Sequence, residues 1–169
     1  IDASETTGKL NFLKVSNTET VTISGGELGA LSGGTVHGGD GIVIDMAAKV
    51  AANSGDVVLN TLSASGSITV SIGSSSLGQS GLVAISALVA SNNFTLDASS
   101  WGGDVDLAGG AAFSAGTNTT ISLGSQANLS GENVIGTGNN FVLDASTAST
   151  AEINIAGGIT AGGAVTLSL

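Results

Sequence analysis

Apolar and polar residues alternate along much of the chain with a period of two. The segments 21–23, 68–72 and 153–155 place Val or Ile at every second position, with Thr, Ser or Asn between them. This is the period of a β-strand with one buried face, and Thr, Val and Ile suit its pleated surface. Only the segment 45–52 has helical propensity. The pattern therefore predicts strands joined by turns.

One kind of strand returns about every 24 residues, in two alternating forms. The first form is a run of Thr, Ser and aliphatic residues, found at 20–24, 68–72, 120–123 and 165–169. The second ends in an aliphatic–aspartate step, at Ile1-Asp2, Ile44-Asp45, Leu96-Asp97 and Leu143-Asp144, and three of these steps continue as Asp-Ala-Ser. A fixed period in this range indicates stacked copies of one supersecondary unit.

A second set of strands is expected about halfway between the first, at 10–15, 56–62, 82–89, 104–107 and 152–155. The same kind of strand recurs at the same position of each unit of about 24 residues. This recurrence favours an all-β fold, a β-solenoid with coils of about 24 residues. The alternative is an antiparallel β-sandwich, in which turns also recur every 8–12 residues.

The whole chain, 1–169, is expected to be a single repetitive domain with repeats at approximately 1–43, 44–95, 96–142 and 143–169. Because it opens inside one copy of the repeat and stops inside another, we expect a fragment of a longer protein.

Alternation also assigns the faces of the strands. Thr95, Val142, Asp97 and Asp144 should face outward. The side chains expected inside are Ile42, Ile44, Phe94, Leu96, Ile121, Leu123, Phe141, Leu143, Val165 and Leu167. Paired glycines, such as 33–34 and 38–39, are expected to supply turns with positive φ. Trp101, in a Ser-Gly-rich turn, is expected to cap the end of a coil.

Composition and charge exclude several functions. The chain has no Cys, which rules out disulfides and thiolate chemistry. Its net charge is −10, with three Lys and no Arg, which argues against nucleic-acid binding and against docking on anionic lipid. No apolar stretch approaches the roughly 18 residues of a membrane span. The acidic balance does permit calcium, which takes oxygen ligands.

Residues for catalysis are sparse, and we expect no enzyme. His37 is the only His and lies in a Gly-rich segment. Asp104 and Asp106 should share one face of a strand about 7 Å apart, but aromatic residues that hold a sugar make up only 3% of the chain. An ice- or polysaccharide-binding solenoid needs a flat, regular outward array of Thr or aromatic residues, and the Thr positions are too irregular for that, so we do not expect this class.

The Asp of Asp-Ala-Ser either forms a turn, binds calcium or has no specific role. A short carboxylate at a strand end accepts hydrogen bonds from backbone N–H groups two residues on, or it binds calcium. The candidate calcium ligands are Asp40, Asp45, Asp97, Asp104, Asp106 and Asp144. A calcium site takes six to eight oxygens, more than any single loop here supplies, so it would draw on adjacent coils or molecules.

Two resemblances bear on function. The segment 38–45 resembles the calcium-binding nonapeptide G-G-x-G-x-D-x-U-x of RTX secreted proteins at Gly38, Gly39 and Gly41, with Val43 in place of the liganding Asp. The segments 18–26, 94–99 and 141–146 resemble repeats of bacterial surface-layer (S-layer) proteins of the RTX-secreted kind. A weaker resemblance, at 155–167, is to filamentous-haemagglutinin-like adhesins.

The S-layer resemblance implies a structural protein of the extracellular bacterial cell surface, which forms a self-assembling lattice stabilised by calcium. Its partners would be other copies of itself and, as a further candidate, cell-surface polysaccharide. The alternative is a stalk segment of a large secreted adhesin.

Overall fold

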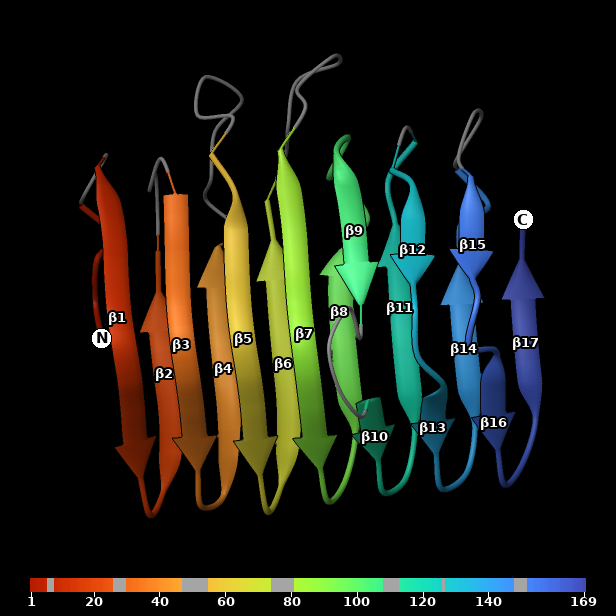
Figure 1. Ribbon diagram of the computed structural model, residues 1–169, viewed down its shortest axis with the longest axis horizontal. Helices are drawn as coiled ribbons and strands as arrows, with labels where there is room; N and C mark the ends of the chain where they lie inside the picture. The colour runs from red at the N-terminus through yellow and green to blue at the C-terminus, as the bar shows by residue number, and fades with distance from the viewer. Residues whose placement is uncertain are drawn as a thin grey trace.

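The chain folds as an all-β solenoid with coils of about 24 residues. The computed structural model describes residues 1–5, 8–25, 30–46, 55–73, 81–107, 113–125, 127–147 and 152–169. Figure 1 shows the strands side by side along the long axis of the molecule, with the N-terminus at one end and the C-terminus at the other. Every strand pairing in these ranges is parallel, which excludes the antiparallel sandwich.

The strands form two sheets that pack face to face, and the chain passes from one sheet to the other within each coil. The seven-stranded sheet contains β2 (Thr20–Ser24), β4 (Gly41–Met46), β6 (Ser67–Ile72), β8 (Phe94–Ala98), β11 (Thr119–Leu123), β14 (Phe141–Asp144) and β17 (Val165–Ser168). These strands correspond to the two alternating forms found in the sequence. Each repeat of the aliphatic–aspartate step therefore spans two coils.

The ten-stranded sheet begins with four long strands, β1 (Lys9–Asn17), β3 (Ala30–Gly38), β5 (Val57–Ala64) and β7 (Leu82–Ala90). Later coils replace the long strand by two short ones: β9 (Asp104–Leu107) with β10 (Phe113–Ala115), β12 (Leu129–Gly131) with β13 (Ile135–Thr137), and β15 (Ile153–Ile155) with β16 (Ile159–Ala161). Both β9 and β10 pair with β7. The sequence did not predict β3, β10, β12, β13 or β16.

The core lies between the two sheets and consists of stacked aliphatic side chains. Phe94 and Phe113, one from each sheet, meet edge to face with ring centroids 5.1 Å apart. Eight of the ten side chains expected inside are buried, and Thr95, Val142, Asp97 and Asp144 face outward as predicted. Val165 and Leu167 are instead about half exposed, at 49% and 50%, because β17 is the last strand of its sheet.

Two glycines expected in a turn lie within a strand. Gly33 and Gly34 belong to β3, and among the described residues only Gly158 has a positive φ, of 82°. A Cβ on Gly33 would come within 2.5 Å of Cζ of Phe12, and one on Gly34 would overlap the Leu13 carbonyl of the neighbouring coil. These glycines therefore let adjacent coils approach each other. Of the segment with helical propensity, Asp45 and Met46 belong to β4, and 47–52 lie outside the described residues.

Candidate binding surfaces

The aspartates of the aliphatic–aspartate steps form one column on the outward face of the seven-stranded sheet. Strand register sets each of them beside a serine of the next coil, in the order Asp2, Ser24, Asp45, Ser71, Asp97, Ser122, Asp144 and Ser168. Like charges directly opposite each other in a sheet are destabilising. The serines hold the carboxylates two coils apart, roughly 10 Å, which explains why the sequence repeat is twice the coil length.

Three of these aspartates form turns with the serine two residues later. The Oδ1 atom of Asp97 accepts hydrogen bonds from the Ser99 backbone N–H at 3.1 Å and from its hydroxyl at 2.6 Å. Asp144 accepts the equivalent pair from Ser146, at 3.0 and 2.7 Å.

Asp2 and Ser4 repeat the arrangement, with distances of 3.0 and 2.7 Å. The hydroxyl bond, and then the backbone bond, lower the pKa of Asp2 and of Asp144 below the ordinary 3.8. This geometry is that of the turn-forming interpretation.

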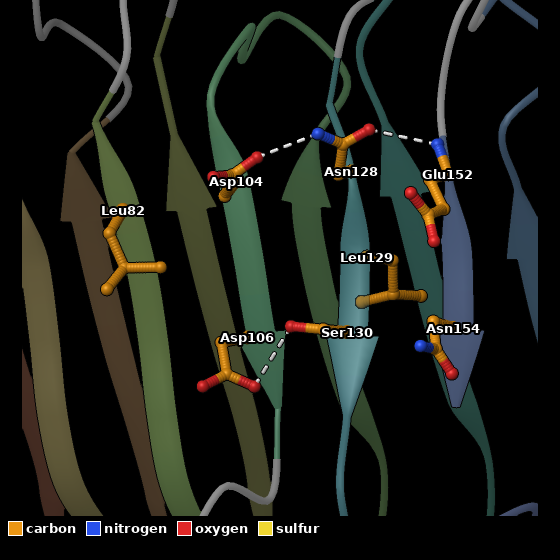
Figure 2. A pocket seen from close by; sticks show the side chains of 8 residues that line it. All are labelled: Leu82, Asp104, Asp106, Asn128, Leu129, Ser130, Glu152 and Asn154. Carbon is orange, nitrogen blue, oxygen red and sulfur yellow. Dashed lines mark hydrogen bonds between the residues drawn. The ribbon is translucent and has the colours of Figure 1, made fainter. Parts of the chain in front are cut away.

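A second acidic surface lies on the ten-stranded sheet, where a shallow groove of about 360 Å³ crosses β9, β12 and β15. Figure 2 shows its lining, which is Leu82, Asp104, Asp106, Asn128, Leu129, Ser130, Glu152 and Asn154. Asp104 and Asp106 face outward and Val105 and Leu107 are buried, as the alternation predicted. The partners from the next two coils were not predicted, because their positions depend on strand register.

Acids in this groove alternate with amides and hydroxyls, as on the other sheet. The Asn128 side-chain amide donates to Oδ1 of Asp104 at 2.9 Å, and its own oxygen accepts from the Glu152 backbone N–H at 2.9 Å (Figure 2). The Ser130 hydroxyl donates to Oδ1 of Asp106 at 3.1 Å. The carboxylates of Asp104 and Asp106 are thus engaged in a polar ladder that links adjacent coils.

The six candidate calcium ligands lie on different parts of the molecule. Asp45, Asp97 and Asp144 are in the Asp/Ser column, Asp104 and Asp106 are in the groove, and Asp40 is exposed in the turn between β3 and β4. Within the described ranges, no three Asp, Glu or His side chains converge in a way that could hold a metal ion. The six candidate ligands therefore do not converge on one point of the described structure, and calcium shared between molecules stays a prediction.

The outward face of the seven-stranded sheet also carries a column of β-branched residues. Strand register aligns Thr22, Val43, Thr69, Thr95, Thr120, Val142 and Thr166, one from each strand. Asn93, Asn118 and Asn140 run beside it, and a shallow groove of about 370 Å³ lies between the two columns. The interpretation that Thr is irregularly placed was therefore wrong, because coils of unequal length bring these residues into one line.

The asparagines beside this column form a hydrogen-bonded ladder. The Asn118 side-chain amide donates to Oδ1 of Asn93 at 3.0 Å, and the Asn140 backbone N–H donates to Oδ1 of Asn118 at 3.2 Å. Oδ1 of Asn140 in turn accepts from the Ala164 backbone N–H at 3.0 Å. The ladder ties four coils together at the start of their strands and orders this edge of the face.

Two residues singled out in the sequence take no part in these surfaces. Trp101 is buried, with 1% of its surface exposed, so its ring is not a platform for a ligand. His37 is an exposed residue of β3 rather than part of a turn.

Comparisons with protein-family models, with curated proteins and with solved structures found no match to this chain. The resemblance to S-layer and RTX repeats therefore stays a prediction. In the part of the chain that the structure describes, there is no helix of the length and apolarity needed to cross a membrane.

Proposed function

We propose that the chain is a rigid, non-enzymatic structural rod of a protein on the extracellular surface of a bacterium. The observation that carries the proposal is the unbroken parallel register of the seven-stranded sheet, from β2 to β17. Each coil adds one strand spacing, about 4.8 Å, to the length of the rod. A rod of this kind can hold another part of the protein at a fixed distance from the cell surface, as a stalk does.

The distribution of polar groups supports the same role. Carboxylates alternate with serine, asparagine or apolar residues along the axis, so that none of the described strand pairings sets two acids side by side. Repulsion between coils is thereby kept small in a chain of net charge −10. A rod built in this way can be lengthened by repetition without accumulating electrostatic strain.

A self-assembling lattice is the second proposal. The observation in its favour is the resemblance of the segments 18–26, 94–99 and 141–146 to repeats of S-layer proteins. Cell-surface polysaccharide would be a further partner of either assembly.

Lengthening the rod tests the proposal. A variant in which the repeat 96–142 is duplicated should gain two coils and about 10 Å of length, measured by small-angle X-ray scattering. The matched control carries a Gly/Ser linker of the same length at the same point. An insertion that leaves the long dimension unchanged, or that behaves like the flexible control, would contradict the rod.

Electron microscopy separates the two forms of the proposal. Isolated rods support the stalk, and ordered sheets or tubes support the lattice. Amorphous aggregates or compact particles of uniform size would contradict both.

A further inference from the structure

The outward face of the seven-stranded sheet has a regularity that a rod does not require. Its central column contains five Thr and two Val, so every strand presents a β-branched methyl group at the same position. Neighbouring methyl groups along the axis are separated by the strand spacing, about 4.8 Å. Five of the seven positions add a hydroxyl beside the methyl.

Strand propensity alone does not account for this column. The ten-stranded sheet has an equivalent outward column with the same pleat, and it contains Asn11, Ser32, Val58, Ala84, Asp106, Ser130 and Asn154. Those positions mix charged, polar and apolar side chains. The uniform column is thus specific to one face of the molecule.

Charge is also excluded from the middle of this face. In a chain of net charge −10, neither the Thr/Val column nor the strand-start column beside it, which includes Thr20, Ser67 and the asparagine ladder, has an ionised group. The carboxylates of the sheet lie in the Asp/Ser column at the other edge. The centre is therefore complementary to an uncharged, hydrogen-bonding surface.

The face is also held rigidly. Each strand is paired on both sides except at the ends of the sheet, and the asparagine ladder orders one edge. A rigid array loses little conformational entropy when it meets an ordered partner.

We propose that this face binds ice, with the Thr/Val column as its centre. The methyl groups order a layer of water between them, and the threonine hydroxyls and asparagine amides hydrogen-bond that layer in place. The strand spacing along the axis, about 4.8 Å, is close to one repeat of the oxygen lattice of ice. The inference does not depend on the rod serving as a stalk or as a lattice.

Inhibition of ice recrystallisation by the purified chain tests the proposal. The chain should keep ice grains small, and the double variant Thr95→Lys/Thr120→Lys should lose this activity because two charged side chains would stand above the face. The control Thr61→Lys changes a partly exposed threonine on the ten-stranded sheet and should keep the activity. Circular dichroism checks that each variant is folded.

Conservative variants separate the methyl group from the hydroxyl. Thr95→Val/Thr120→Val should retain the activity, because Val43 and Val142 already occupy this column. Thr95→Ser/Thr120→Ser should reduce it, because the methyl groups are lost. These substitutions keep the fold even where lysines would not.

Three results would overturn the proposal: a folded chain with no effect on ice, a double lysine variant with unchanged activity, or equal loss in the Thr61→Lys control. Binding of the chain to an insoluble polysaccharide, abolished by the double lysine variant and with no effect on ice, would assign the face to glycans instead.

Discussion

At the scale of single residues, the aspartate-serine turn has a measurable electrostatic consequence. Oδ1 of Asp144 accepts two hydrogen bonds from Ser146, and both favour the ionised carboxylate. The folded-state pKa therefore lies below the value in the unfolded chain. The bonds stabilise the folded chain at pH values above the unfolded pKa, and that stability is lost as the pH falls through the folded pKa.

Replacing Ser146 by Ala should raise the pKa of Asp144 towards 3.8, because the hydroxyl bond is the larger cause of the shift. Carbon-detected NMR of the carboxyl group over an acid titration measures the change. Ser122→Ala is a suitable control, since it alters the same column but leaves the turn intact. An unchanged Asp144 pKa in Ser146→Ala would show that the hydroxyl does not stabilise the carboxylate.

Thr119 is a second residue with a clear physical consequence. It is fully buried between Phe94 and Phe141 of the adjacent coils, and its hydroxyl has no hydrogen-bond partner among the described residues. A buried hydroxyl without a partner costs about 1–3 kcal/mol. An apolar side chain of the same shape removes that cost.

We therefore expect Thr119→Val to increase the free energy of unfolding by about 1 kcal/mol, measured by chemical denaturation. The adjacent Thr120 faces outward, so Thr120→Val should change stability by less than about 0.5 kcal/mol. Destabilisation by Thr119→Val would mean that the hydroxyl has a partner in solution.

At the scale of strands, register decides which side chains interact. Ser122 of β11 lies between Asp97 of β8 and Asp144 of β14. Ser122→Asp would place three carboxylates on consecutive strands. Opposed like charges in a sheet are unfavourable by up to about 1 kcal/mol for each pair, so the variant should melt at a lower temperature than the parent chain.

High salt should restore part of the loss in Ser122→Asp, because exposed charges at this distance are screened. The control Ser122→Asn introduces a side chain of about the same volume as Asp but without its charge. This variant should melt at a temperature close to that of the parent chain. Equal melting temperatures for the Asp and Asn variants would contradict the role of the alternation.

At the scale of the whole molecule, the dispersal of carboxylates predicts how calcium acts. Because no three acids of the described chain converge, we expect dilute monomer to melt at the same temperature in calcium and in chelator. At high concentration, calcium shared between molecules should promote association, measured by light scattering, with magnesium as the control ion. A calcium-dependent melting temperature in the dilute monomer would contradict this prediction.

The class of fold, the coil length and most of the core could be predicted from the amino-acid sequence. These properties are local or periodic: alternation of apolar residues defines a strand and its buried face, and recurrence about every 24 residues implies stacking. Phe94, Leu96, Phe141 and Leu143 were placed correctly for this reason. Strand β3 was missed because its paired glycines resemble a turn, and only their close approach to Phe12 and Leu13 of the neighbouring coil explains them.

The three-dimensional structure was needed to show which outward residues lie next to one another. Coils differ in length, from the step between Thr22 and Val43 to the longer step between Val43 and Thr69, so residues that share a column are unevenly spaced along the chain. The alternation of Asp with Ser, the groove around Asp104 and the Thr/Val column all depend on that register. Backbone pairing between coils sets the register of the strands. Outward side chains bury little surface, so they form no periodic apolar pattern in the sequence from which that register could be inferred.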